Sequence, residues 1–254
     1  MPKLDISGNV STQTDAEGGK LKVILTGATG MVGEGVLLEC LAHPAVEEVL
    51  LVGRKRYPAE HPKLTQCIVP DFLNLASAVT RLTGYNACFY CAGVSSAGMK
   101  EADYSHVTYD LTLHFARTLA GLNPRMTFIY FSGALTDSTE KGRVMWARVK
   151  GRTENALTRL GFGAVYNFRP GFMKPTPGQQ NAKGYYKLIG WLYPILHTLL
   201  PNQVSTLQQV ALAMIRVALY GYPKTILEIK DINALAAQTA PPVSVGIAPG
   251  KFFL

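Results

Sequence analysis

The stretch MWARVK (145–150) contains two residues that could do chemistry from one place. Trp146 and Lys150 are four residues apart, so on a helix they share a face one turn apart. A lysine there can bind hydroxyl groups, and burial can lower its pKa until it acts as an acid or a base. An indole N–H donates a hydrogen bond but does not titrate in the useful range. The pair therefore raises the question of whether this stretch catalyses a reaction or only binds a ligand.

The stretch VILTGATGMVGEGVL has the spacing of a nucleotide-binding loop. Gly27, Gly30 and Gly33 form TGxxGxxG between a candidate strand and a candidate helix. The first glycine permits a tight turn, the second lets the backbone approach a pyrophosphate, and the third lets helix pack on strand. Free amides at the helix N-terminus favour the anion. We predict a nicotinamide dinucleotide site that includes Thr29 and Met31, the alternative being a tight turn without a ligand.

The residues after the next two strands suggest which dinucleotide binds. About 20 residues beyond the loop, where an NAD site has an acidic residue for the ribose, the chain reads LLVGRKR with Arg54. A guanidinium attracts a 2′-phosphate, so we expect NADP(H) in preference to NAD(H). The alternative is that residues 54–56 are an exposed basic turn. Asp71, beside Phe72, either accepts from the adenine amino group or caps a helix that begins near Leu73.

Short β-branched runs alternate with helical periodicity along the chain, a pattern typical of βαβ units and a parallel sheet. Strands are expected at 22–26, 48–52, 66–69, 87–91, 127–131 and 164–168. Helices are expected at about 32–42, 73–82, 102–121, 140–160, 184–199 and 206–220. The pattern predicts an α/β fold, a doubly wound parallel sheet with a small C-terminal helical substrate-side region. Ligand sites should lie at the carboxyl ends of the strands.

Composition is consistent with one domain of this kind. Of 254 residues, 48% are hydrophobic and 17% charged, enough for one buried core. We expect a flexible tail at 1–20 and a single domain at 21–254, with 171–222 as a substrate-side cap. The tail is polar and resembles neither a signal peptide nor an anchor. The apolar stretch 187–201 is interrupted by Pro194 and is too short to span a bilayer, so no stable membrane insertion is expected.

Charge and cysteine usage narrow the partners and the compartment. The net charge of +8 comes from scattered Lys and Arg residues, and no nucleic-acid recognition motif accompanies it, so a nucleic-acid partner is not expected. Cys88 and Cys91 have CxxC spacing, but in a strand an odd separation points them to opposite faces. The four cysteines are read as buried reduced thiols of a cytoplasmic protein. The histidines show no metal-ligand spacing, so no metal site is expected.

Taken together, these motifs resemble an extended or atypical short-chain dehydrogenase/reductase, similar to NAD(P)-dependent epimerases and dehydratases and to their Tat-interacting-protein-like branch. The resemblance covers roughly residues 21–230 and is carried by TGATGMVG, VGR, CAGVSS, YFSG and VKG. It implies a Rossmann fold and a small-molecule substrate. Members of the family often pair as homodimers through helices on the sheet faces, and the oligomeric state of this chain stays open.

The resemblance also implies roles for particular residues. Ser132 matches the family's strand-end serine, and Lys150 matches the lysine of YxxxK, but Trp146 stands where the tyrosine belongs. In the family the tyrosine transfers a proton while the lysine lowers its pKa and holds the ribose hydroxyls. Without that tyrosine, the candidate proton donors are Ser132, Lys150, water and the pair Tyr185 and Tyr186.

Two further segments border the implied site. The fourth strand ends at Cys91, Ala92 and Gly93, which the resemblance places near the adenosine ribose and the nicotinamide. Pro170 and Gly171 correspond to a turn that borders the nicotinamide, although an ordinary exit from the strand would look the same. The preceding residue in RPGFMKP, an arginine, could meet a substrate anion or form a structural ion pair.

Two functions fit these residues. The first is an NADP(H)-dependent oxidoreductase or epimerase-like enzyme that acts on a small molecule through Ser132 and Lys150. The second is a catalytically silent NADP(H)-binding sensor or interaction protein, which Trp146 favours because it cannot replace the tyrosine. The substrate cannot be named from the sequence, because the late segment that would select it contains no recognisable motif.

Overall fold

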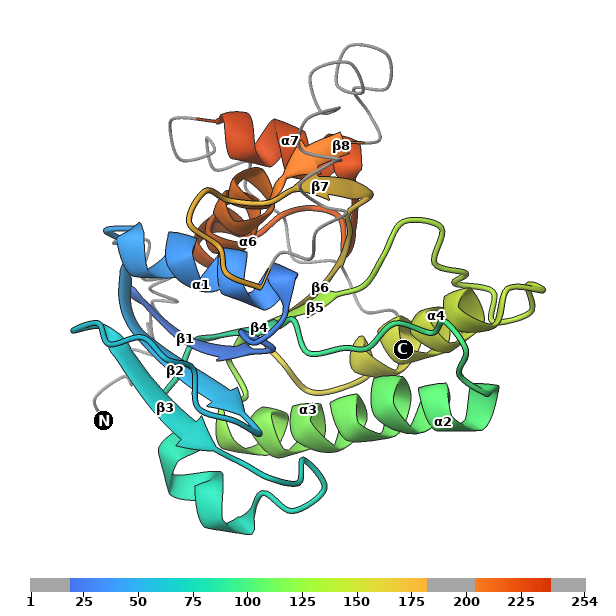
Figure 1. Ribbon diagram of the computed structural model, residues 1–254, viewed down its shortest axis with the longest axis horizontal. Helices are drawn as coiled ribbons and strands as arrows, with labels where there is room; N and C mark the ends of the chain where they lie inside the picture. The colour runs from blue at the N-terminus through green and yellow to red at the C-terminus, as the bar shows by residue number, and fades with distance from the viewer. Residues whose placement is uncertain (1–18, 182–203, 239–254) are drawn as a thin grey trace, which may run out of the picture.

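The computed structural model describes residues 19–181 and 204–238, which form a seven-stranded sheet with helices on both faces (Figure 1). The strand order is β3-β2-β1-β4-β5-β6-β9, and every neighbouring pair is parallel. Its strands are β1 (Leu21–Thr26), β2 (Val46–Gly53), β3 (Leu64–Ile68), β4 (Ala87–Tyr90), β5 (Thr127–Phe131), β6 (Ala164–Arg169) and β9 (Ile226–Glu228). The predicted doubly wound Rossmann architecture is confirmed.

Both faces of the sheet are covered, which is why its central strands are apolar along their whole length. The helices are α1 (Met31–Ala42), α2 (Glu101–Ser105), α3 (Leu111–Leu122), α4 (Met145–Leu157), α6 (Leu207–Tyr220) and α7 (Ile229–Ala237), with a 3₁₀ turn η1 (Ala76–Leu82) and a π turn η2 (His106–Asp110). Helices α1 and α6 cover one face, and α2, α3 and α4 lie on the other (Figure 1). The carboxyl ends of the central strands open between these layers.

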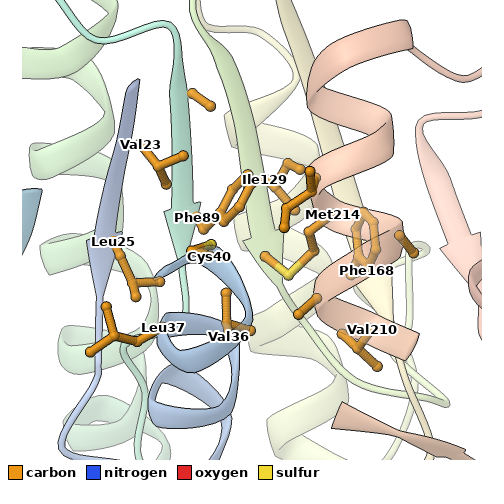
Figure 2. Packing of buried hydrophobic residues seen from close by; sticks show 14 of the residues in the cluster. Val23, Leu25, Val36, Leu37, Cys40, Phe89, Ile129, Phe168, Val210 and Met214 are labelled. Atoms are coloured by element: carbon orange, nitrogen blue, oxygen red, sulfur yellow. The ribbon is translucent and has the colours of Figure 1, made fainter. Parts of the chain in front are cut away.

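The core between the sheet and the α1–α6 layer is continuous. Figure 2 shows strand residues meeting residues of α1 and α6, namely Val23, Leu25, Phe89, Ile129 and Phe168 with Val36, Leu37, Cys40, Val210 and Met214. Helix α6 begins at a reciprocal cap in which Thr206 Oγ1 accepts from Gln209 N at 3.0 Å and Gln209 Oε1 accepts from Thr206 N at 2.8 Å. Residues 207–220 of the expected cap are therefore a core helix of the domain.

The elements differ from the expectations in several places. The helix expected at 102–121 runs through α2, the π turn η2 and α3, and the helix expected at 73–82 is the 3₁₀ turn from Ala76. The helix expected at 140–160 starts only at Met145, because the Asp137 carboxylate accepts from Thr139 N at 3.0 Å and Gly142 N at 2.6 Å and holds a loop there. Strand β9, helix α7 and the short pair β7 (Phe172–Lys174) and β8 (Val204–Thr206) were not expected. The helix expected at 184–199 lies outside the described residues.

Candidate functional site

The glycine loop joins β1 to α1 and is packed too tightly for side chains at two positions. Gly27 has φ +79°, and a Cβ there would lie 2.6 Å from the carbonyl carbon of Cys91. A Cβ on Gly33 would overlap the carbonyl oxygen of Gly27. At Gly30 the nearest atom to a Cβ would be the Gly27 oxygen at 3.4 Å. The first and third glycines thus bring the end of β4 and the start of α1 against one turn, as the motif requires.

Two cavities meet around this loop. The larger, of about 700 Å³, is lined by Thr29, Gly30, Met31, Val32, Gly33, Cys91, Ala92, Gly93, Val94, Ser95, Tyr104, Thr108, Tyr130, Phe131, Lys150, Gln180 and Asn181. The smaller, of about 400 Å³, is lined by Gly27, Ala28, Thr29, Gly30, Leu51, Val52, Gly53, Arg54, Lys55, Phe72, Cys91, Ala92 and Gly93. Both share Thr29, Gly30 and Cys91 to Gly93, so the two cavities adjoin at the carboxyl edge of the sheet.

The end of β4 is held to β1 by a residue that sequence reasoning missed. Thr26 Oγ1 accepts from the backbone N–H groups of Cys91 and Ala92, each at 3.1 Å. The threonine of the TG dipeptide could have signalled this role. Burial raises the pKa of the Cys91 thiol, so this side chain is a neutral wall residue. Cys88 and Cys91 pack on opposite faces of the sheet, as predicted.

The residues expected at the adenosine end are only partly brought together. Arg54 is exposed and lines the smaller cavity, whereas Arg56 lines a separate surface hollow. Phe72 lines the smaller cavity and packs against Phe115 with tilted rings, whose centroids are 5.2 Å apart. Asp71 lines neither cavity, and its Oδ1 accepts from Leu73 N at 2.9 Å. Asp71 therefore closes a local turn, and it does not cap a helix near Leu73, because the next helical element, η1, begins only at Ala76.

Lys150 lies on α4 and lines the larger cavity opposite the glycine loop. Its Nζ donates to the backbone carbonyl of Ser132 at 2.8 Å, across from the end of β5. Desolvation by burial lowers the pKa of Lys150 to about 8, against an opposing effect of the Glu154 charge. A cavity-lining amine with such a pKa changes its charge within reach of neutral pH.

The Ser132 hydroxyl, by contrast, is turned away from the cavities. Ser132 is 2% exposed and lines neither of them, and its Oγ is 3.0 Å from Thr136 Oγ1. Thr136 Oγ1 in turn donates to the carbonyl of Gly133 at 2.8 Å. The structure therefore does not bring the predicted catalytic hydroxyl to the cavity, because a local hydroxyl network engages it. Ser132 contacts Lys150 through its backbone carbonyl oxygen, which accepts a hydrogen bond from the amine.

Trp146 packs beside the backbone after β5. A Cβ on Gly133 would lie 3.9 Å from Cζ3 of Trp146, and the indole is half-buried and lines neither cavity. The glycine after Lys150 has a packing role, since a Cβ on Gly151 would overlap the carbonyl oxygen of Asp137. The VKG sequence thus lets α4 approach the 133–144 loop closely.

Residues 169–171, at the end of β6, make structural contacts outside the two cavities. Pro170 and Gly171 line neither cavity, and the Pro170 carbonyl accepts from Ala134 N at 3.0 Å. Arg169 Nε and Nη2 donate to the two carboxylate oxygens of Glu154 at 3.0 and 2.5 Å, and Nη1 lies 3.4 Å from Glu228. The arginine is thus a buried structural ion-pair partner, and the Pro170 carbonyl links the segment after β6 to the loop after β5.

Sequence reasoning missed one side of the larger cavity. Tyr104 of α2, Thr108 of η2 and Tyr130 of β5 line it together with Lys150. Burial raises the pKa of Tyr104 and of Tyr130, so both phenols are neutral at physiological pH. The helical spacing of Tyr104 was read as core packing, and its 2% exposure agrees with that. Its position on the cavity depends on tertiary packing, which helical spacing alone does not indicate.

Comparison with known proteins identifies relatives of this chain. No family model matches it. Protein fmp52-1, mitochondrial, of Aspergillus terreus is 30% identical over 161 residues, which cover 61% of this chain and 67% of that protein. The chain belongs to the fmp52 protein family. Leucinostatins biosynthesis cluster protein T of Purpureocillium lilacinum is 29% identical over 144 residues, 55% of this chain, and the match spans only about half, 52%, of that protein.

The names of the fmp52 relatives correct one expectation. Those from Aspergillus terreus, Emericella nidulans and Aspergillus clavatus are named as mitochondrial proteins, so the cytoplasmic location expected from the sequence is wrong. The inference failed because reduced, buried cysteines fit any compartment that is not oxidising.

Solved structures share the fold of this fmp52 family member. The Bordetella bronchiseptica enzyme WbmF in complex with NAD⁺ matches with a TM-score of 0.59 and 14% identity, over 86% of this chain and 77% of that one. NADPH-bound carbonyl reductase from chicken fatty liver matches with a TM-score of 0.54 and 17% identity, over 84% and 94%. The expected likeness to epimerase/dehydratase and short-chain dehydrogenase/reductase proteins is confirmed in the fold.

The described residues include neither a membrane-spanning helix nor a cluster of metal-binding side chains. Within 19–181 and 204–238, none of the helices combines the length and apolar content needed to cross a bilayer. In the same ranges, no group of three or more His, Cys, Asp or Glu side chains is arranged to hold a metal ion. The apolar stretch 187–201 and the donor candidates Tyr185 and Tyr186 lie outside the described residues.

Proposed function

We propose that this chain is an NADP(H)-dependent oxidoreductase or epimerase-like enzyme that acts on a small molecule. The observation that carries the proposal is the position of Lys150, whose amine lines the same cavity as the glycine loop and donates to the Ser132 carbonyl at 2.8 Å. An amine with a pKa of about 8 is a usable acid near neutral pH.

The residues around the loop fit a dinucleotide. Gly27 and Gly33 leave no room for side chains, so the backbone of the turn is free to face a ligand. The two cavities adjoin at the loop, which suits an elongated molecule with a ring system at each end. Arg54 at the smaller end supports NADP(H) over NAD(H), and the larger end would then take the nicotinamide and the substrate.

We assign the following roles in the proposed reaction to groups around the larger cavity. The bound nicotinamide would supply or accept hydride. Lys150 would donate a proton to the substrate oxygen or withdraw one from it, in place of the tyrosine that Trp146 replaces. The Ser132 carbonyl fixes the position of the amine, and Tyr104 and Tyr130 wall the cavity as neutral phenols. The homodimer implied by the resemblance stays a prediction.

A second function has its own support. Trp146 has no group that titrates usefully, and the Ser132 hydroxyl is engaged by Thr136. A sensor that binds NADP(H) and signals to a partner without turnover would tolerate both features.

The two proposals are separated by NADPH oxidation in a fractionated metabolite extract. Wild type is compared with Lys150→Ala and Lys150→Arg, after cofactor binding by each has been measured. An enzyme oxidises NADPH in some fraction and loses this with Lys150→Ala, whereas Lys150→Arg binds cofactor but turns over slowly because arginine does not release its proton. Cofactor binding without oxidation in every fraction would contradict the enzyme and support the sensor.

A further inference from the structure

Glu34 is a buried carboxylate in the first turn of α1, one residue after the glycine loop. It is 1% exposed and, among the described residues, forms no ion pair. Its oxygens instead accept from Tyr57 Oη at 3.1 Å, from Gln180 N at 3.0 Å and from Asn181 N at 2.7 Å. A buried carboxylate is stable only when hydrogen-bond donors surround it. These contacts therefore tie the backbone of residues 180 and 181 to α1.

The segment 176–181 is bound to α1 by a second residue as well. Gln179 Nε2 donates to the Met31 carbonyl at 2.5 Å, and Gln179 Oε1 accepts from Thr176 N at 2.6 Å. A Cβ on Gly35 would lie 3.2 Å from Gln179 Oε1 and 2.9 Å from Leu207 Cδ1. The small residue at position 35 therefore lets this segment lie directly on the first turn of the helix.

The docked segment ends in two residues that line the larger cavity together with Lys150, namely Gln180 and Asn181. Their backbone amides are the ones that Glu34 holds, and both side chains are carboxamides. A carboxamide both donates and accepts hydrogen bonds, so this wall suits a substrate that carries hydroxyl or carbonyl oxygens.

We propose that Glu34 is a positioning residue that holds Gln180 and Asn181 as the substrate-recognising wall of the cavity, for a substrate with several hydroxyl or carbonyl groups. The substrate role rests on the proposed function, whereas the anchoring of 176–181 does not. The Glu34 carboxylate contacts cavity-lining residues through the backbone amides of this segment, so we assign it to recognition and leave the proton transfer to Lys150.

The test measures amide hydrogen exchange of residues 176–181 in the full chain, for wild type, Glu34→Gln, Tyr57→Phe and Glu39→Gln. The isosteric Glu34→Gln places an N–H₂ against a backbone donor, so exchange at Gln180 and Asn181 should rise at least about tenfold. Tyr57→Phe keeps both backbone contacts and should leave this exchange within about twofold of wild type. Glu39→Gln, on the same helix but away from the segment, is the matched control and should have no effect.

Activity gives the second readout. In the active metabolite fraction, Glu34→Gln should raise KM severalfold while kcat and NADPH affinity stay within about twofold, which a general loss of packing would not produce. Unchanged exchange in Glu34→Gln would overturn the anchoring role, and a fall in kcat with unchanged KM would overturn the recognition role.

A second variant and a measurement that needs no ligand allow the anchoring role to be tested even if Glu34→Gln does not fold. Asn181→Pro removes one of the backbone donors to Glu34 while Glu34 itself is kept, so it replaces Glu34→Gln if that variant does not fold, and exchange at Gln180 should again rise. Exchange needs neither cofactor nor substrate. Failure of NADPH to bind wild type would therefore contradict the proposed function while the exchange result still decides the anchoring.

Discussion

Lys150 and Trp146 share one face of α4 but meet different surroundings. Lys150 lines the larger cavity and bonds the Ser132 carbonyl, whereas Trp146 packs beside Gly133. Desolvation lowers the pKa of the amine to about 8. The lysine that the sequence suggested as a ligand-holding residue is thus the one that we propose moves a proton.

The pH dependence of turnover follows from this pKa. Below about 8 the Lys150 side chain is protonated and can donate, and above it the side chain is a neutral amine. We expect kcat for NADPH-dependent reduction to fall as the pH rises through about 8. The measurement is a kcat profile from pH 6 to 10 in the active metabolite fraction. A flat profile over this range would remove Lys150 as the proton donor.

Arg54 provides the test of cofactor preference. Its guanidinium lines the smaller cavity, where a 2′-phosphate would gain a charge-assisted hydrogen bond. We expect Arg54→Ala to weaken NADPH binding at least about tenfold and NADH binding by less than about twofold. Arg56→Ala is the matched control because Arg56 lines a different hollow. Titration calorimetry with both cofactors checks this, and equal losses for NADPH and NADH would be inconsistent with 2′-phosphate recognition.

At the scale of the element, the glycine turn fixes how closely α1 approaches β1 and β4. Gly33 and Gly27 are in backbone contact with their neighbours, whereas Gly30 leaves space for a methyl group. We therefore expect the glycines to have separable roles, Gly33 in packing the helix and Gly30 in facing the proposed ligand.

This separation predicts different outcomes for two alanine variants. Gly33→Ala should lower the free energy of unfolding by at least about 2 kcal/mol, because the new Cβ overlaps the Gly27 carbonyl. Gly30→Ala should change it by no more than about 0.5 kcal/mol, while weakening NADPH binding through a crowded ligand-facing backbone. Urea denaturation of both variants checks the predicted stabilities, and cofactor titration checks the predicted NADPH binding. Equal stability of the two variants would contradict the packing role of Gly33.

Across the whole molecule, one buried ion pair joins elements that lie far apart in the sequence. Arg169 at the end of β6 pairs with Glu154 of α4, donates to Ser138 Oγ at 2.6 Å and reaches Glu228 of β9. The pair therefore connects the sheet edge, the helix that carries Lys150 and the loop after β5.

Breaking this pair should affect the entire domain. Glu154→Ala leaves the buried Arg169 charge without its main partner, so the free energy of unfolding should fall by about 3–5 kcal/mol. Glu101→Ala removes the exposed partner of Arg148 and should cost less than about 1 kcal/mol. Urea denaturation of both variants checks the comparison, and equal effects would mean that the Arg169 pair is not a structural connection.

The sequence by itself determined the parts of this protein that depend on local chemistry. The spacing of Gly27, Gly30 and Gly33 predicted the turn between β1 and α1, and alternating apolar runs predicted six of the seven strands in the main sheet. These signals are local because a turn and a buried strand are specified by a few consecutive residues.

The tertiary structure alone decided how distant residues meet. It turned the Ser132 hydroxyl toward Thr136, paired Arg169 with Glu154, and added Tyr104 and Gln180 to the cavity of Lys150. It also added β9, whose three residues are too few to give a pattern. Burial and hydrogen-bond partners belong to the packed chain, since the residues that desolvate Lys150 or hold Glu34 come from separate segments and have no fixed spacing in the sequence.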